Sequence, residues 1–302
     1  MKPIGYDMHA GRTAMPASIE IAPRQALESR DLPGLFPPGT KTYLCDVGVD
    51  AVKDFVRAVR RVRDLGYEPV PHIPARRMRS HAELRDRVQA YAEEGGASDV
   101  LVVGGGLTRP AGPYSSTMEV LSTGILDRHG FRDIGVAGHP EGTPDFSAAT
   151  ASEALRLKRD FARRSDARLR IVTQFGFDAA VYLHWAESVR AAGIDLPIHL
   201  GVAGPAKIAT LIRFAALCGI GNSVSVLKKR PSALTALATS HSPESVAGPI
   251  ERHWAETTDT PVRQLHVFPF GGLAASAQWL YGRGSWMDAT AIQTAAGDRQ
   301  HA

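Results

Sequence analysis

The sequence has few cysteines, no long apolar run and no apolar leader. Its two cysteines, Cys45 and Cys218, lie far apart in 302 residues, which excludes a disulfide scaffold and a cysteine-rich zinc site. No stretch approaches the roughly 18 uninterrupted apolar residues of a membrane-spanning helix. The first sixteen residues mix charge, glycine and proline, unlike a secretory signal. We therefore expect a cytoplasmic protein without a membrane span.

Several functional motifs are also missing. There is no P-loop, no nucleophile elbow, no metal-ligand cluster, and no G-x-G-x-x-G after the first predicted strand. The formal charge of +4 is spread over arginine-rich helices, so it disfavours nucleic-acid binding but suits an anionic substrate. Hydrophobic residues make up 44% and charged residues 22%, which excludes wholesale disorder.

The sequence does contain a regular alternation of short apolar runs and amphipathic stretches. Eight runs are predicted strands: Ser18–Ile21, Thr42–Cys45, Pro69–His72, Asp99–Val103, Asp133–Ala137, Arg170–Gln174, Pro197–Gly201 and Gln264–Phe268. Helical spacing, capping boxes and a proline N-terminal signal predict helices at Ala51–Asp64, after Ser80, after Thr150, at Pro205–Leu217 and after Ser242. Several strands are continuously apolar, which is typical of strands buried on both faces.

This order predicts one (β/α)₈ barrel over residues 17–288, with additional helices between the seventh and eighth strands. Residues 1–16 would form an N-terminal arm and residues 289–302 a polar tail. An open, doubly wound sheet is the alternative, which the missing dinucleotide fingerprint disfavours.

In a barrel, chemistry lies at the carboxyl ends of the strands. Glu20 lies inside the apolar run SIEIAP of the first strand, where an unpaired buried carboxylate would be costly. Two interpretations stay open. Glu20 is either solvent-facing or salt-bridged, or it is an acid with a raised pKa that donates a proton.

The other predicted strand ends also carry polar or small residues: Asp46, His72, Gly104–Gly106, His139–Thr143, and Gln174 with Phe175. Glycines let a phosphate or a flat ring approach the backbone, and an amide beside aromatic rings can recognise a heterocycle. Each also has a structural interpretation as a core residue or a tight loop. The residues alone predict a barrel enzyme with an aromatic heterocyclic ligand, one strategic carboxylate and no metal.

A resemblance extends this interpretation. The segments SIEIAP, PHIP, VAGHPEGTPD, LRLKRD, RIVTQFGFD, AGIDLPIHLGV and LHVF, in this order from Ser18 to Phe268, resemble the methylenetetrahydrofolate reductase family. That family is a (β/α)₈ barrel that binds FAD at the strand ends. The resemblance implies an oxidoreductase that interconverts 5,10-methylenetetrahydrofolate and 5-methyltetrahydrofolate, with FAD as cofactor and NAD(P)H as cosubstrate.

The resemblance also implies roles for individual residues. Glu20 matches the general acid that assists opening of the folate five-membered ring, and Gln174 matches a glutamine that contacts the pterin. Phe175, Phe268 and Lys228 are expected near the substrate, Lys228 either at the folate carboxylates or in a solvated basic loop. The positions that match the flavin site are Asp46, His72, Gly104, Gly105, Gly106, His139, Thr143, Glu153, Arg156 and Arg159.

Several positions depart from the family pattern. Gly104–Gly106 replace an Arg-Gly-Asp motif, Asp46 a threonine, His139 a tyrosine, Thr143 a histidine, Phe268 a tyrosine, and Gly272 an arginine that holds the folate tail. These changes leave open a flavoenzyme that runs in the methyl-oxidising direction and a flavin-independent reductase with direct hydride transfer. A pterin-binding methyltransferase and a non-redox folate-binding barrel are alternatives from other classes. The sequence does not decide the direction, NADH against NADPH, or whether the chain is a homo-oligomer.

Overall fold

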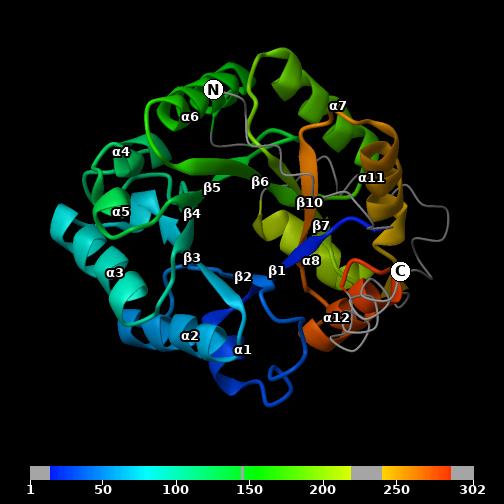
Figure 1. Cartoon of the computed structure of the whole chain (residues 1–302), viewed down its shortest axis with the longest axis horizontal. Coiled ribbons are helices and arrows are strands. Elements are labelled where there is room, and N and C mark those ends of the chain that lie inside the picture. Colours follow the sequence, from blue (N-terminus) through cyan, green and yellow to red (C-terminus); the bar gives the residue numbers. More distant parts are fainter. Residues whose placement is uncertain (1–13, 144–145, 219–239, 287–302) are drawn as a thin grey trace, which may run out of the picture.

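Eight parallel strands close into a barrel in the computed structural model, which describes residues 14–143, 146–218 and 240–286. The strands neighbour one another in the order β1-β10-β7-β6-β5-β4-β3-β2 (Figure 1). The barrel strands are β1 (Ala17–Ile21), β2 (Lys41–Leu44), β3 (Glu68–Pro74), β4 (Asp99–Val103), β5 (Asp133–Gly138), β6 (Arg168–Gly176), β7 (Ile198–Ala203) and β10 (Val262–Phe268). The predicted (β/α)₈ barrel is therefore confirmed.

Helices surround this ring of strands (Figure 1). They are α1 (Pro23–Glu28), α2 (Val52–Asp64), the 3₁₀ helix η1 (Ala75–Arg77), α3 (His81–Glu93), α4 (Thr117–Leu121), α5 (Ile125–Arg128), α6 (Ala148–Arg163), α7 (Ala179–Ala191), α8 (Ile208–Leu217), α11 (Glu244–Glu256) and α12 (Leu273–Gly282). A short antiparallel pair, β8 (Ala206–Lys207) and β9 (Ser240–His241), lies outside the barrel.

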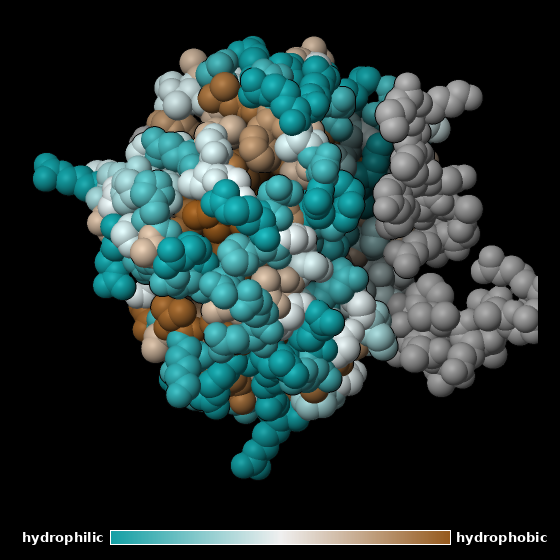
Figure 2. Space-filling model, turned by 60° about the vertical axis from the view of Figure 1, so that its left-hand side comes forward, coloured by the Kyte–Doolittle hydropathy of each residue, from teal (hydrophilic) through white to brown (hydrophobic). Residues whose placement is uncertain are grey.

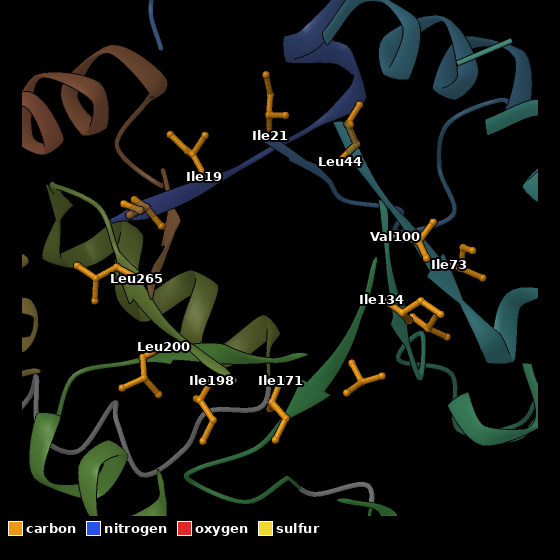
Figure 3. Close-up of a cluster of buried hydrophobic side chains, with 14 of the residues drawn as sticks. Ile19, Ile21, Leu44, Ile73, Val100, Ile134, Ile171, Ile198, Leu200 and Leu265 are labelled. Carbon is orange, nitrogen blue, oxygen red and sulfur yellow. The ribbon is translucent and has the colours of Figure 1, made fainter. Parts of the chain in front are cut away.

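The main apolar core lies between the strands and the helices. Ile19 and Ile21 of β1 are at most 1% exposed and point away from the barrel centre, as do the other labelled side chains of Figure 3. Side chains alternate along a strand, so the alternate residues Ser18 and Glu20 point into the barrel. The apolar alternation of SIEIAP thus fixes which residues of β1 face the interior.

Each predicted strand overlaps one barrel strand, but two helix starts differ from the prediction. Helix α6 begins at Ala148 because Ser147, rather than Thr150, caps it; the Ser147 hydroxyl accepts a hydrogen bond from the Thr150 backbone N–H. Pro205–Lys207 were predicted to open a helix, but residues 206 and 207 pair with β9, and α8 begins only at Ile208.

The predicted arm and tail lie mostly outside the described residues. The last residues of the arm are packed against the barrel: Met15 is fully buried, and its backbone N–H bonds to Glu251 of α11. On the outside, the face with α3 to α6 is mostly hydrophilic with scattered apolar spots (Figure 2). In the described part of the chain, no helix combines the length and the apolar character needed to cross a bilayer.

Candidate active site

Glu20 meets two histidines inside the barrel, near the carboxyl ends of the strands. Its Oε2 atom lies 3.7 Å from Nε2 of His72 on β3 and 3.5 Å from Nε2 of His266 on β10. The side chain of Glu20 is 18% exposed, that of His72 10% and that of His266 0%. Three strands far apart in the sequence therefore place one carboxylate between two imidazoles, at a site that solvent barely reaches.

The pKa of Glu20 is lowered, which differs from the raised pKa that one of the two sequence interpretations required. Burial favours the neutral acid, but the interaction with His266 and the charges of His72 and His266 outweigh it, so the pKa lies below its ordinary value. Burial also lowers the pKa of His72, against the opposite pull of Glu20. Glu20 is therefore an ionised carboxylate at neutral pH unless its surroundings change.

His266 was missed by the sequence reasoning, although its position on the inner face of LHVF, two residues before Phe268, was a usable signal. Its Nδ1 lies 3.1 Å from the Ser18 hydroxyl, and its ring centroid is 4.4 Å from that of Tyr43. The other face of the site begins with Phe268, whose ring is 4.8 Å from the imidazole. His266 thus joins the carboxylate to an aromatic surface.

A polar network fills the opposite end of the barrel interior. Tyr43 accepts a hydrogen bond from Nε of Arg170 at 2.9 Å, and Nη2 of Arg170 bonds to Asp99 at 2.9 Å. Asp99 also pairs with Lys41 at 2.6 Å. The Arg170 and Asp99 side chains are 8% and 6% exposed. This network fixes the hydroxyl end of Tyr43, whose ring faces His266.

Gln174 is positioned by an irregularity in β6. The register between β6 and β7 shifts between Val172 and Phe175. Within this bulge, the Gln174 side-chain oxygen accepts from the Phe175 backbone N–H at 3.1 Å, and the Gln174 carbonyl accepts from the Tyr182 hydroxyl. The bulge holds both the backbone and the amide of Gln174 at the carboxyl end of the strand.

Five phenylalanines form an aromatic wall beside the histidines; its members are Phe175, Phe177, Phe214, Phe268 and Phe270. Phe175 is 1% exposed and packs on Phe268 at 5.4 Å between ring centroids, so it is a core residue. Phe270 is half-buried and stacks on Phe214 at 4.3 Å with 18° between the planes. The wall therefore has a buried base and a partly accessible edge.

Asp46 is already occupied. Its Oδ2 accepts from Nη1 of Arg87 at 2.5 Å, its Oδ1 accepts from the Gly48 backbone N–H at 2.8 Å, and the residue is 8% exposed. Asp46 thus fastens the loop after β2 to α3. Its carboxylate is therefore engaged with protein groups, although the family resemblance predicted Asp46 at the flavin site.

Two of the three glycines after β4 leave room beside the backbone, whereas a Cβ added at Gly105 would lie 2.9 Å from Cβ of Pro74. Gly105 and Gly106 have φ values of 97° and 67°, which favour glycine. An added Cβ at Gly104 or Gly106 would meet no described atom within 4 Å. Nε of Arg77 donates a hydrogen bond to the Gly105 carbonyl and thereby holds the loop in place. We therefore describe Gly104–Gly106 as an open backbone cradle.

The remaining predicted residues fall in two groups along α6. His139 and Thr143 lie in the loop before it, partly buried, with the His139 ring 5.2 Å from Phe146. Glu153 and Arg156 form an exposed pair at 3.4 Å. Arg159 instead bonds to Asp160 and to the Gly193 carbonyl, at the amino-terminal side of the barrel.

The structure therefore does not bring Arg159 to the rim that carries Glu20. The loop after α7, which contains Gly193, leads into the start of β7, so it lies at the opposite end of the barrel. Lys228 lies outside the described residues. In the described part of the chain, no group of histidines, cysteines and carboxylates has the arrangement of a metal site.

Comparison with known proteins identifies the family. The family described as methylenetetrahydrofolate reductase matches residues 54–230, more than half of the chain. This chain belongs to the methylenetetrahydrofolate reductase family. Its relatives include 5,10-methylenetetrahydrofolate reductase of Pectobacterium carotovorum, 30% identical over 51% of this chain and 50% of the relative. The Escherichia coli enzyme of the same name is 28% identical over 54% of this chain and 53% of its own.

The chain thus spans about half the length of these curated relatives in the matched regions. Among solved structures, a Clostridium thermocellum protein described as binding two copies of 5-methyl-5,6,7,8-tetrahydrofolic acid has a TM-score of 0.53. It is 8% identical and covers 90% of this chain and 95% of its own, so this likeness bears on the fold alone.

The family implies FAD, and the residues here fit the ring end of that cofactor better than its phosphate end. The cradle at Gly104–Gly106 has the open backbone that a flat ring needs, and His72 has a buried Nε2 atom without a hydrogen-bond partner among the described residues. Arg156 is exposed and available to a pyrophosphate, whereas Arg159 is engaged elsewhere.

Proposed function

We propose that this protein interconverts 5,10-methylenetetrahydrofolate and 5-methyltetrahydrofolate by hydride transfer. The observation that carries the proposal is the position of Glu20, which faces the barrel interior beside His72 and His266 in a chain of the methylenetetrahydrofolate reductase family. The aromatic wall beside it suits a ligand built from flat rings.

Glu20 has a defined task in this reaction. Opening the five-membered ring of methylenetetrahydrofolate breaks a bond between carbon and N10, and the departing nitrogen takes a proton while the remaining iminium accepts hydride. Glu20 would donate that proton in the reducing direction and accept it in the oxidising direction. Gln174 would bond to the pterin through its amide, and Phe268 and Phe270 would line the ring system.

We further propose that FAD is the resident cofactor and NAD(P)H the cosubstrate. FAD supplies, when bound, a two-electron acceptor that carries hydride between nicotinamide and folate. The residues that would hold it are the cradle Gly104–Gly106, His72, His139, Thr143, Glu153 and Arg156. The exposed pair of Glu153 and Arg156 would contribute by exchanging its internal partner for the phosphates or the ribose.

Direct hydride transfer from NAD(P)H without flavin is the second candidate. One observation in its favour is that Asp46, at a position expected to contact the flavin, has its carboxylate in an ion pair with Arg87. It is also favoured by Gly104–Gly106, which have no side chain to offer the ring. A cradle of this kind serves a nicotinamide ring as well as an isoalloxazine.

The test is anaerobic turnover of the purified protein with methylene- and methyltetrahydrofolate, with and without added FAD, against NADH and NADPH. The proposal predicts folate-dependent oxidation or reduction of the nicotinamide and a protein that carries a flavin absorbance band. Turnover by a colourless protein without added FAD supports direct transfer. No turnover in either direction rejects the reductase and leaves a methyltransferase or a folate-binding barrel.

A further inference from the structure

The interaction between Glu20 and His266 has one feature that a simple salt bridge does not explain. The Ser18 hydroxyl lies 3.4 Å from the Leu265 carbonyl and 3.1 Å from Nδ1 of His266. A carbonyl can only accept, so both contacts are hydrogen bonds only when the hydroxyl donates to the carbonyl and accepts from Nδ1. We adopt this tautomer of His266, with a proton on Nδ1.

With Nδ1 protonated, Nε2 is the atom of His266 that gains or loses a proton. It faces Oε2 of Glu20 at 3.5 Å and has no hydrogen-bond partner among the described residues. A bare imidazole lone pair opposite a carboxylate oxygen would be repulsive in this buried place. One proton between the two atoms removes the repulsion, whether it sits on nitrogen or oxygen.

The groups around this pair do not compete for that proton. Burial lowers the pKa of His72 and of His199, and burial raises the pKa of Tyr43 and of Cys45, so these side chains are neutral near pH 7. Asp46, Arg170 and Lys41, which also act on these groups, are already paired. Burial raises the pKa of Cys218 to about 11, so it is neutral as well, and the charge of Asp50 adds to the raised pKa of Cys45.

We propose that Glu20 and His266 share one proton and act together as the acid of this site, with His266 as the positioning residue that stores the proton. This inference rests on the proposed function for its chemical role. As the bond from carbon to N10 breaks, the shared proton passes from Nε2 of His266 to Oε2 of Glu20 and from Oε2 to N10. The pair then holds one proton fewer, as carboxylate and neutral imidazole, and solvent water restores it after product release.

Two features make His266, rather than His72, the store. His266 is fully buried and anchored at Nδ1 by Ser18, with Tyr43 against its ring, so its orientation toward Glu20 is fixed. The side chain of His72 is 10% exposed and lies slightly farther from Oε2. His72 therefore remains available to a ligand, while His266 can reach one only through Glu20.

The first test measures the proton itself. The ¹⁵N NMR signals of the ring nitrogens of His266 are recorded in the wild type and in Glu20→Gln, and they are assigned by through-bond correlation from the assigned backbone. We expect the Nε2 signal of His266 at neutral pH to lie closer to that of a protonated ring nitrogen in the wild type than in Glu20→Gln. Equal Nε2 signals in the two proteins would overturn the shared proton. This readout needs no folate, so it is independent of whether the proposed activity exists.

The second test measures its use. His266→Gln keeps a hydrogen-bond donor but cannot store a proton, so kcat should fall about 10-fold or more with KM nearly unchanged. As pH rises, the variant should lose activity at a lower pH than the wild type does. His199→Gln is the matched control, another buried interior histidine, and should leave the pH profile in place. A His266→Gln profile identical to the wild type would contradict the role. If His266→Gln does not fold, the NMR comparison of the wild type with Glu20→Gln still decides.

Discussion

The two ends of the barrel interior solve the same physical problem in opposite ways. At the amino-terminal end, Arg170 and Asp99 are buried charges whose groups meet partners at 2.9 Å, with Lys41 completing the set. Near the carboxyl end, Glu20 has two imidazoles at 3.5 and 3.7 Å, both longer contacts than those of the paired network. The polar groups of the first end are paired with one another, whereas the second end keeps donors and acceptors that a ligand could bind.

The difference teaches where this fold places stability and where it places chemistry. A fully paired network costs little once formed and tolerates no missing member. A carboxylate and two histidines whose hydrogen-bonding atoms are not all paired can bind a ligand or transfer a proton. Tyr43 connects the two ends, because its hydroxyl belongs to the network and its ring packs on His266.

The largest expected effect comes from breaking the paired network. Arg170→Met leaves Asp99 and Tyr43 without their shared donor, so the free energy of unfolding should fall by about 3 kcal/mol. Arg168→Met is the control on the same strand, since the Arg168 side chain is 62% exposed in its pair with Asp133. It should change stability by less than about 1 kcal/mol. Urea unfolding of both variants checks this, and equal losses would mean that burial of the network does not matter.

The histidines between the two ends make stability depend on pH. Burial is the main cause that lowers the pKa of both His72 and His199 in the fold. Below the ordinary histidine pKa of about 6.5, the unfolded chain binds protons that the folded chain does not, so stability falls as pH decreases. The slope is at most about 1.4 kcal/mol per pH unit for each histidine.

Urea unfolding at several pH values between about 7 and 5 measures this slope. This pH range brackets the ordinary histidine pKa of about 6.5. His199→Gln should flatten it, since one of the two groups is removed. A variant slope equal to that of the wild type would show that His199 takes up its proton in the folded state.

The smallest expected effect comes from Ser18. Ser18→Ala removes the acceptor of His266 Nδ1 without changing any charge, so stability should fall by about 1–2 kcal/mol. The ¹⁵N signal of His266 Nδ1 should also shift, because its contact with the Ser18 hydroxyl is lost. An unchanged free energy of unfolding and an unchanged Nδ1 signal would remove Ser18 from the account.

Much of the fold could be predicted because short apolar runs alternate with amphipathic helical stretches along the chain. All eight barrel strands were predicted from this order, whereas the start of α6 was not. Thr150 and Glu153 have capping-box spacing, but Ser147 is an equally good cap three residues earlier and the helix extends to it. Local capping chemistry alone could not choose between them.

The site was predictable only in part. Glu20 was detectable because a carboxylate within an apolar strand is unusual. The position of His266 in its strand was readable, but its contacts were not. His266, Tyr43 and the Asp99–Arg170 pair meet across strands far apart in the chain, and no sequence spacing records such contacts. Likewise, the charge of Asp46 could be read, but not that Arg87 already occupies it.

The central claim is that Glu20 serves chemistry while the opposite end of the barrel serves stability. It is tested most directly by measuring Glu20→Gln for anaerobic turnover with methylenetetrahydrofolate and for unfolding free energy in the same preparation. We predict that turnover falls by about 10²-fold or more while folate binding and the unfolding free energy stay close to those of the wild type. Wild-type turnover in Glu20→Gln, or a loss of stability like that expected for Arg170→Met, would contradict the account.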